Sequence, residues 1–521
     1  MQTLRRTVAI LTFPAIAYLG AACERTEMPT GGRLLASLAG PARLLVDDDL
    51  VQCPTAQFTS IQAAVTAAQP GDHIDVCPGT YNEQVIIPAG KDNIRLRSTR
   101  RWEAVIKAPM VMVPYNGNFI IVRIAGAQNV TILAFTITGP GPGGCGTLHY
   151  GVRVDNGGSA DILGNHITQI RDNPLSGCQN GVAVLVGRQF EATIGSARII
   201  GNVIDNYQKN GPTVDNTGSH AEIAYNRILG IGPTALIAQN GIQVSRGATA
   251  EIRHNFVSGN IYTPQTFASG GLLLFGPGAV LTDHNTASSN DVSIWMIGTA
   301  SGSMTTDNRV RASTFDGIAV DGPTGNQVTR NKTDHNGGPG IGVYTANSNT
   351  LDDNKVEDNN DSGILLDFAA QNNDIGENKV RDNGTTSTTN PDATDGIRVN
   401  DAFSTGNTVH DNRLKHNVTH DCHDNSMGTG TAGTSNSWIN NDGTTSNPPG
   451  LCGEDENDAD FETSTVYGWD AAYPWYDAFG IAAAEYDFAT AYAMIDTESL
   501  LQLLPAIRTG GIRRATPSPN Q

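Results

Sequence analysis

The sequence predicts an all-β chain that folds as a single-stranded right-handed parallel β-helix with an N-terminal capping helix and a small helical C-terminal cap. Two observations predict it. A Gly-Ile/Val-x-Val phrase returns along the chain, and from Gly317 to Gly340 to Gly363 its period is 23 residues. Within each repeat, Ile and Val alternate with other residues, the period of two that a strand with one inward face requires. A repeat this short holds strands but no helix, so successive repeats must stack as the coils of a solenoid.

The repeat can be followed through most of the chain. It appears as GVRV at 151–154, GVAV at 181–184, GIQV at 241–244, GIAV at 317–320, GIGV at 340–343, GILL at 363–366 and GIRV at 396–399. The longer gap between 363 and 396 holds an insertion, GTTSTTNPDAT, that we expect to form an exposed loop. We therefore assign residues 50–454 to the β-helix.

Asparagines recur in pairs separated by four residues. At the same place in successive coils, an Asn side chain can hydrogen-bond to its copies above and below, as in other stacked parallel sheets. Asn also tolerates the left-handed backbone that a sharp corner needs. The pairs are Asn255 and Asn260, Asn285 and Asn290, Asn331 and Asn336, Asn354 and Asn359, Asn378 and Asn383, and Asn412 and Asn417. We interpret them as structural.

Both ends of the solenoid need a cap, because an open sheet edge invites aggregation. Residues 58–69 have helical spacing that places Ile61, Val65 and Ala68 on one face, with Thr59 or Ser60 as N-cap. Residues 455–504 change from an acidic to an aromatic and then an Ala-rich helical segment, which we expect to be the C-terminal cap. A disordered tail is expected at 505–521.

The N-terminus has the pattern of an export signal. Residues 1–23 contain Arg5 and Arg6, an apolar run over 8–19 and a small-residue cleavage zone, so we expect a signal peptide followed by a linker over 24–49. Cys23 stands near the place of a lipoprotein cysteine, and both lipidation and plain cleavage stay open. No other stretch is long and apolar enough to predict a membrane span.

The remaining six cysteines form three local couples: Cys53 with Cys77, Cys145 with Cys178, and Cys422 with Cys452. In an exported chain these are expected to be disulfides rather than metal ligands. The predicted location is therefore secreted, periplasmic or at the cell surface, with a lipid anchor if Cys23 is modified. We expect a monomer.

Charge restricts the partners. With 52 acidic and 33 basic residues, the net charge is −19. A nucleic-acid partner is not expected, because it needs a basic surface. An anionic polysaccharide would be repelled unless cations intervene, so neutral sugars and cation-bridged acidic sugars both stay open.

The stretch FTSIQAAVTAAQPGDHIDVCPGTYNEQVII at 58–87 closely resembles the opening of pectin-lyase-like right-handed β-helix proteins. The later Gly-Ile-x-Val and Asn-x-Val phrases look like the repeats of that superfamily, including its NosD-like group. The resemblance covers about 50–450. It implies the fold and allows pectate lyases, polygalacturonases, esterases, epimerases and non-catalytic surface proteins, so it does not choose a function.

The motifs that would identify one enzyme family within this superfamily are absent from the sequence. It contains no Asn-Thr-Asp, Gly-His-Gly or Arg-Ile-Lys of polygalacturonases, no Asp-Phe-Ile-Phe-Gly of pectin esterases, no Tyr-Gly-x-Asp-Pro-His of mannuronan epimerases and no Arg-x-Pro-x-x-Arg of pectate lyases. Each specific assignment is weakened accordingly.

One outward column could carry chemistry. The residues that follow successive Gly-Ile-x-Val phrases are Asp321, Tyr344, Asp367 and Asn400, with Arg398 two residues before Asn400. Asp321 and Asp367 would lie two coils apart, about 9–10 Å, near the separation used in inverting glycoside hydrolysis. Tyr344 and Arg398 could instead support a lyase. Gln243 and Ser245 hold like positions in an earlier coil and are candidate substrate-binding residues. The alternative is a solvated polar face.

A second column precedes the second Asn of each pair: His335, Asp358, Asp382 and His416. Its carboxylates could bind Ca²⁺, although corner residues in water explain it equally. The run at 420–424 (HDCHD) is also rich in ligand types, but a disulfide at Cys422 favours a stapled cap there over a metal site.

Two functions follow as hypotheses. The first is a polysaccharide lyase or glycoside hydrolase that works at Asp321, Tyr344, Asp367 and Arg398. The second is a non-catalytic envelope or surface protein that binds glycans or acts as a rigid spacer.

Overall fold

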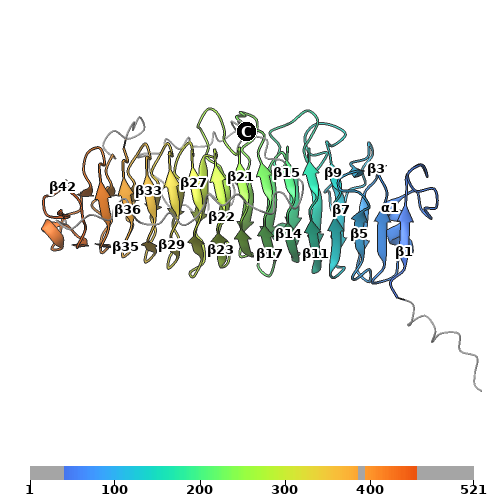
Figure 1. Ribbon diagram of the computed structural model, residues 1–521, viewed down its shortest axis with the longest axis horizontal. Coiled ribbons are helices and arrows are strands. Elements are labelled where there is room, and N and C mark those ends of the chain that lie inside the picture. Colours follow the sequence, from blue (N-terminus) through green and yellow to red (C-terminus); the bar gives the residue numbers. More distant parts are fainter. Residues whose placement is uncertain (1–39, 385–393, 455–521) are drawn as a thin grey trace, which may run out of the picture. The chain divides into compact units, whose positions relative to one another are not determined.

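The computed structural model describes residues 40–384 and 394–454 and confirms the right-handed parallel β-helix. Figure 1 shows successive coils side by side, from the N-terminal strands in blue to the C-terminal strands in orange. The predicted signal peptide with Cys23, the C-terminal cap at 455–504 and the tail at 505–521 lie outside the described residues, as does part of the insertion after residue 384.

Each coil contributes one strand to each of three sheets, and all pairing between strands is parallel. The 15-stranded sheet contains β1 (Arg43–Val46), β2 (His73–Val76), β5 (Arg95–Ser98), β8 (Val130–Leu133), β11 (Gly158–Leu163), β14 (Gly195–Ile200), β17 (His220–Ala224), β20 (Thr249–Arg253), β23 (Val280–Asp283), β26 (Met304–Thr306), β29 (Gln327–Thr329), β32 (Thr350–Asp352), β35 (Asp374–Gly376), β38 (Thr408–His410) and β41 (Ser437–Ile439).

The 14-stranded sheet contains β4 (Val85–Pro88), β7 (Ile120–Ala125), β10 (Tyr150–Asp155), β13 (Val182–Val186), β16 (Asn210–Asp215), β19 (Ile242–Ser245), β22 (Gly270–Phe275), β25 (Val292–Ile297), β28 (Ile318–Asp321), β31 (Ile341–Tyr344), β34 (Ile364–Asp367), β37 (Ile397–Val399), β40 (Cys422–Asp424) and β42 (Ser446–Asn447).

The 13-stranded sheet contains β3 (Gly79–Asn82), β6 (Ala104–Lys107), β9 (Thr136–Thr138), β12 (His166–Thr168), β15 (Val203–Asp205), β18 (Arg227–Leu229), β21 (Phe256–Ser258), β24 (Thr286–Ser288), β27 (Arg309–Arg311), β30 (Lys332–Asp334), β33 (Lys355–Glu357), β36 (Lys379–Arg381) and β39 (Arg413–Lys415). Two 3₁₀ turns, Gln189–Glu191 and Thr431–Gly433, lie outside the sheets.

The core follows from the alternation within each strand. In the 14-stranded sheet, Val320 of β28 pairs with Val343 of β31, which pairs with Leu366 of β34, and all three side chains are fully buried. Burying one such side chain contributes roughly 1.5–3 kcal/mol. The residues between them point outward, so each sheet presents its own regular outer face.

The predicted N-terminal cap is confirmed as α1 (Ile61–Ala67), the α-helix of the described part of the chain. Ser60 is the N-cap, and its side chain accepts a hydrogen bond from the backbone N–H of Ala63. The Glu83 carboxylate accepts the N–H groups of Ile61 and Gln62, so the first turn of the helix has its donors satisfied. Ile61 and its neighbours on the inner face cover the end of the core.

The solenoid begins earlier than the sequence predicted. Residues 24–49 were expected to be a linker, but β1 already pairs with β2 from Arg43 onward. The buried carboxylate of Asp75 on β2 bonds both Arg43 and Arg97. Without β1, that carboxylate would lose one of its two cations, which explains why the ordered sheet extends over residue 43.

The Asn pairs form the ladders that were predicted. The Asn354 amide nitrogen donates to Asn378 Oδ1 at 2.9 Å, and its own Oδ1 accepts from Asn331 Nδ2 at 3.1 Å. A third ladder, which the sequence analysis missed, lines the corner between the 14- and 15-stranded sheets. It contains Asn326, Asn349, Asn373, Asn407 and Asn436.

The expectation that the Asn residues themselves take the left-handed backbone is wrong. The left-handed residue is the one that precedes the ladder Asn in most coils, such as Asp353 (φ 50°) before Asn354 and Asp358 (φ 56°) before Asn359. The physical reason is that the corner must turn before the Asn side chain can point inward to its ladder partners.

The three predicted cysteine couples are disulfide-bonded: Cys53–Cys77, Cys145–Cys178 and Cys422–Cys452. Three disulfides are typical of a protein that folds in an oxidising, extracellular or periplasmic compartment. Among the residues that the structure describes, no helix is long and apolar enough to span a membrane.

Candidate functional site

The predicted catalytic column lies on the outer side of the 14-stranded sheet. Asp321, Tyr344 and Asp367 end three neighbouring strands, β28, β31 and β34, and they are direct register partners. Two strand spacings separate Asp321 from Asp367, which corresponds to about 9–10 Å. The structure therefore brings these three residues together as the period of 23 indicated.

Tyr344 is held in one position rather than free to react. Its hydroxyl donates to Asp316 Oδ2 at 2.8 Å, and its side chain is almost fully buried. The ring lies across Gly342 of the same strand, where a Cβ atom would come within 2.3 Å of the hydroxyl oxygen. Burial, followed by the Asp316 charge, raises the pKa of Tyr344 well above its usual value. Tyr344 therefore has a fixed position between Asp321 and Asp367 in the outward row.

Asp367 is a carboxyl group whose pKa is raised toward neutral. Burial first, and then the neighbouring Asp401 carboxyl, raise its pKa to about 6. The pKa of Asp401 is lowered, despite burial, by its contact with Asp367 and by backbone N–H donors from Ala369 and Phe403. Below about pH 6 the pair therefore holds a single proton, which resides on Asp367. Asn400, a predicted binding residue, donates to Asp367 Oδ2 at 3.0 Å.

Two exposed aromatic residues are close in sequence to this carboxyl pair. Phe368 directly follows Asp367 and is 37% exposed, and Phe403 follows Asp401 by two residues and is 72% exposed. Exposed rings next to a protonated carboxyl suit contact with the apolar face of a sugar ring. The sequence analysis did not single out either residue.

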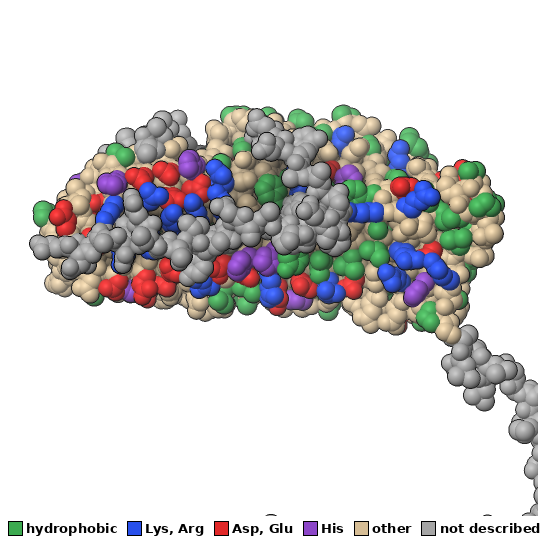
Figure 2. Space-filling model, in the orientation of Figure 1, with side chains coloured by type: hydrophobic (Ala, Val, Ile, Leu, Met, Phe, Trp, Pro, Cys, Tyr) green, Lys and Arg blue, Asp and Glu red, His purple; other side chains and the backbone are tan. Residues whose placement is uncertain are grey.

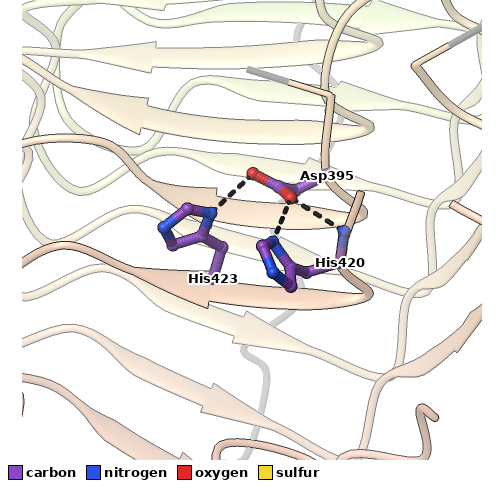
Figure 3. Close-up of side chains that lie close together, drawn as sticks. All are labelled: Asp395, His420 and His423. Atoms are coloured by element: carbon purple, nitrogen blue, oxygen red, sulfur yellow. Dashed lines mark hydrogen bonds and ion pairs between the residues drawn. The ribbon is translucent and has the colours of Figure 1, made fainter. Parts of the chain in front are cut away.

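Arg398 belongs to a second cluster on the two strands that follow. Its Nη1 donates to Asp395 Oδ2 at 2.7 Å, and its Nε donates to Asn400 Oδ1 at 2.8 Å. Asp395 also contacts His420 Nδ1 at 3.0 Å and His423 Nδ1 at 2.8 Å (Figure 3). Because Asp395 already neutralises Arg398, this guanidinium is not an open anion site.

Strand alternation explains the positions of the two histidines. Cys422 points inward and is fully buried, so His423 points outward, in register with Arg398 of β37. His420 lies two residues before β40 begins. Its backbone N–H donates to Asp395 Oδ1 at 2.9 Å. Asp395 was missed by the sequence analysis because the 363–396 insertion hides its register.

Gln243 and Ser245 do not join this site. They lie on β19, three strands before β28 in the sheet order. Gln243 Oε1 accepts from the amides of Asn210 and Asn240 at 3.0 Å each. Ser245 donates to Asp215 Oδ1 at 2.8 Å. They belong to a separate polar patch nearer the N-terminus.

The column predicted to bind Ca²⁺ consists of corner residues. His335, Asp358, Asp382 and His416 all have left-handed backbone, with φ between 56° and 58°. His335 contacts Asp334, and Asp382 pairs with Arg381. In the described part of the chain, the groups of three ligand atoms that converge are elsewhere: Asp395 with His420 and His423, Asp283 with His284 and Asp307, and Asp47 with Asp48 and Asp49.

A buried arginine cluster in the N-terminal half also escaped the sequence analysis. Arg123 and Arg153 are adjacent on β7 and β10 and both pair with Asp155. Arg153 bonds Glu191 at 2.7 Å, and the Arg123 guanidinium lies 3.3 Å from the centre of the Tyr115 ring. The alternation of YGVRVD at 150–155 is the signal that could have revealed two outward charges there.

The 13-stranded sheet carries alternating charges that satisfy one another. Glu357 bonds Lys332, Lys355 and Arg381. Burial alone would raise its pKa, but Lys332 and Lys355 lower it to about 2. Figure 2 shows acidic and basic side chains crowded together around β33 and β36. The cations on this part of the sheet are therefore paired with carboxylates.

Comparison with known proteins gives one family and several distant structures. The model of a family described as "Right handed beta helix region" matches residues 120–310 and 270–443. No curated protein matches the sequence.

Among solved structures, the chain is similar to the periplasmic alginate epimerase AlgG, at 13% identity over 77% of this chain and 82% of that chain, with a TM-score of 0.36. It is similar to the A-module of the Azotobacter vinelandii mannuronan C-5 epimerase AlgE4, at 15% identity over 74% and 94%, with a TM-score of 0.37. It is also similar to the DFA-IIIase of Arthrobacter chlorophenolicus A6, at 14% identity over 67% and 88%, with a TM-score of 0.39.

Proposed function

The chain belongs to the right-handed β-helix family, and from that premise we propose that it binds a polysaccharide along its 14-stranded sheet and hydrolyses glycosidic bonds there. One observation carries the proposal. Two carboxyl groups, Asp321 and Asp367, lie in register two strands apart, and the pKa of Asp367 is raised to about 6, next in sequence to an exposed phenylalanine.

In this mechanism, Asp367 donates its proton to the glycosidic oxygen as the bond to the sugar carbon breaks. Asp321 takes a proton from a water molecule that attacks the opposite face of that carbon. The separation of about 9–10 Å leaves room for the water and corresponds to inversion rather than to a covalent intermediate. Asn400 and Asp401 position Asp367, while Phe368 and Phe403 contact the sugar ring.

The charge around the site favours a neutral substrate. Asp321, Asp367 and Asp401 are acidic, and Arg398, on the strand next to that of Asp367, has its Nη1 bonded to Asp395. An acidic sugar would meet repulsion from these carboxylates, and Arg398 is already engaged, whereas a lyase needs a cation that neutralises the substrate carboxylate.

Location and anchoring form part of the proposal. The disulfides support an oxidising compartment. We propose that residues 1–23 direct export and that the mature monomer is secreted, periplasmic or held at the cell surface, with Cys23 as the lipid attachment if it is modified. A polysaccharide or envelope glycan would be its partner in each location.

A second candidate is a non-catalytic glycan-binding or spacer protein. The observation that favours it is the burial of Asp367, whose side chain is only 7% exposed although it would have to reach a glycosidic oxygen. Binding without cleavage by the wild type would support this second function.

The test is a digestion panel of neutral glycans, pectin and alginate. The wild type is expected to release reducing ends from at least one neutral glycan. Asp367→Asn is expected to lose about 100-fold or more of that rate, since general acid catalysis contributes this much. Asp358→Asn, a corner carboxylate on another face, is the matched control and should retain activity. Products with ultraviolet-absorbing unsaturated ends would refute hydrolysis in favour of a lyase.

A further inference from the structure

Asp395, His420 and His423 form a compact group that the proposed hydrolysis does not use. They come from two neighbouring coils, β37 with the residues before it and β40 with the residues before it. Asp395 is fully buried, and His423 is nearly so. Figure 3 shows both imidazole rings directed at the same carboxylate.

The carboxylate oxygens of Asp395 and the Nδ1 atoms of the two histidines lie close together. Asp395 Oδ1 lies 3.0 Å from His420 Nδ1, and Asp395 Oδ2 lies 2.8 Å from His423 Nδ1. Arg398 Nη1 lies near two of these atoms, 2.7 Å from Asp395 Oδ2 and 3.1 Å from His423 Nδ1. A single donor nitrogen can reach both acceptors only if their lone pairs point toward a shared position.

The second ring nitrogen of His423 has its own support. His423 Nε2 lies 3.0 Å from Asn425 Oδ1 and 3.2 Å from Asn447 Nδ2. In the tautomer in which Nε2 carries the hydrogen and donates it to Asn425, the Nδ1 lone pair is directed at Asp395. An outer hydrogen bond of this kind, which fixes tautomer and ring orientation, is the usual companion of a histidine that binds a metal.

We propose that Asp395, His420 and His423 bind a divalent transition-metal ion through Oδ2 or Oδ1 and the two Nδ1 atoms. Two ligand atoms in adjacent positions around an ion at about 2.1 Å lie about 3 Å apart, which is the spacing seen for both histidines with Asp395. Two imidazoles and one carboxylate suit Zn²⁺, Fe²⁺, Co²⁺ or Ni²⁺. They do not suit Ca²⁺, which prefers oxygen ligands throughout.

The neighbouring acidic residues are engaged elsewhere and are not part of the site. Asp421 Oδ2 accepts the hydroxyl and backbone N–H of Thr444, and Asp424 Oδ2 accepts from Trp438 Nε1 at 2.9 Å. The Cys422–Cys452 bond fixes β40 between them. Arg398 competes with the ion, because its Nη1 lies where the ion's charge would be. This inference does not rest on the proposed hydrolysis.

The experiment is a Co²⁺ titration of chelator-treated full-length protein, followed by calorimetry and visible absorption. The wild type is expected to bind one ion per chain with nitrogen-ligand absorption bands. His420→Ala, His423→Ala and Asp395→Asn should each weaken binding at least tenfold. Arg398→Gln should strengthen it, because the competing guanidinium is gone. His335→Ala, which removes an exposed corner histidine, is the control and should bind as the wild type does.

A second measurement avoids the risk that a variant fails to fold. Wild-type protein is treated with diethyl pyrocarbonate with and without Zn²⁺, and modified histidines are mapped by mass spectrometry. Zn²⁺ is expected to protect His420 and His423 and to leave His335 reactive. The proposal is overturned if Co²⁺ does not bind the wild type, or if Zn²⁺ protects His335 as well as it protects His420 and His423.

Discussion

Removal of one rung from an Asn ladder should cost far more stability than removal of an ordinary asparagine. The Asn354 side chain makes four hydrogen bonds and is 1% exposed. Its amide donates to Val328 O at 2.8 Å and Asn378 Oδ1 at 2.9 Å. Its oxygen accepts from the backbone and side-chain nitrogens of Asn331 at 2.9 and 3.1 Å.

Asn354→Ala would remove these four buried hydrogen bonds with no replacement. At about 1 kcal/mol for each hydrogen bond, the loss is roughly 4 kcal/mol of the free energy of unfolding. Urea denaturation measures the loss, and hydrogen exchange at the Asn331 amide locates it. Asn82→Ala, at an exposed position with one 3.4 Å contact to Thr80, should change stability by less than about 0.5 kcal/mol. A loss below about 1 kcal/mol for Asn354→Ala, or unchanged exchange at Asn331, would refute the ladder as a stabilising device.

Four further outcomes follow from the site and its support. Gly342→Ala should displace the Tyr344 ring, since the new methyl group would overlap it, and alter the near-ultraviolet circular dichroism; an unchanged tyrosine signal would contradict this. Hydrolysis should fall as pH rises through about 6, because Asp367 must be protonated. The pKa of Asp367 is about 6 in the folded protein and 3.8 in the unfolded chain, so its proton stabilises the fold fully below pH 3.8, and this stabilisation is lost as pH rises through about 6. The difference in the free energy of unfolding between wild type and Asp367→Asn should therefore change between these two pH values and stay constant above them. Replacing Cys422 and Cys452 together by Ala opens a loop of 30 residues and should cost about 3 to 4 kcal/mol in the last coils, seen as faster proteolysis there.

The scaffold could be predicted because each coil repeats the same physical requirements. Alternating aliphatic residues place Val320, Val343 and Leu366 inward, and a constant period places Asp321, Tyr344 and Asp367 in one outward row. The disulfide couples were also predictable, since each joins cysteines about one coil apart.

The remaining site features depend on contacts that a period does not encode. Asp395 lies beyond an insertion that breaks the 23-residue spacing, so its approach to His420 and His423 was not visible in the sequence. The raised pKa of Asp367 depends on its burial and then on Asp401, which belongs to the turn after the next strand. Left-handed corners likewise explain the His335 column, which in sequence looked like a row of ligands.

The most direct test of the central claim is the configuration of the first product of neutral-glycan cleavage, followed by proton NMR during digestion. The account predicts a reducing end of inverted anomeric configuration from the wild type and about 100-fold slower release from Asp367→Asn. Retained configuration, an unsaturated product, or equal rates for wild type and Asp367→Asn would contradict it.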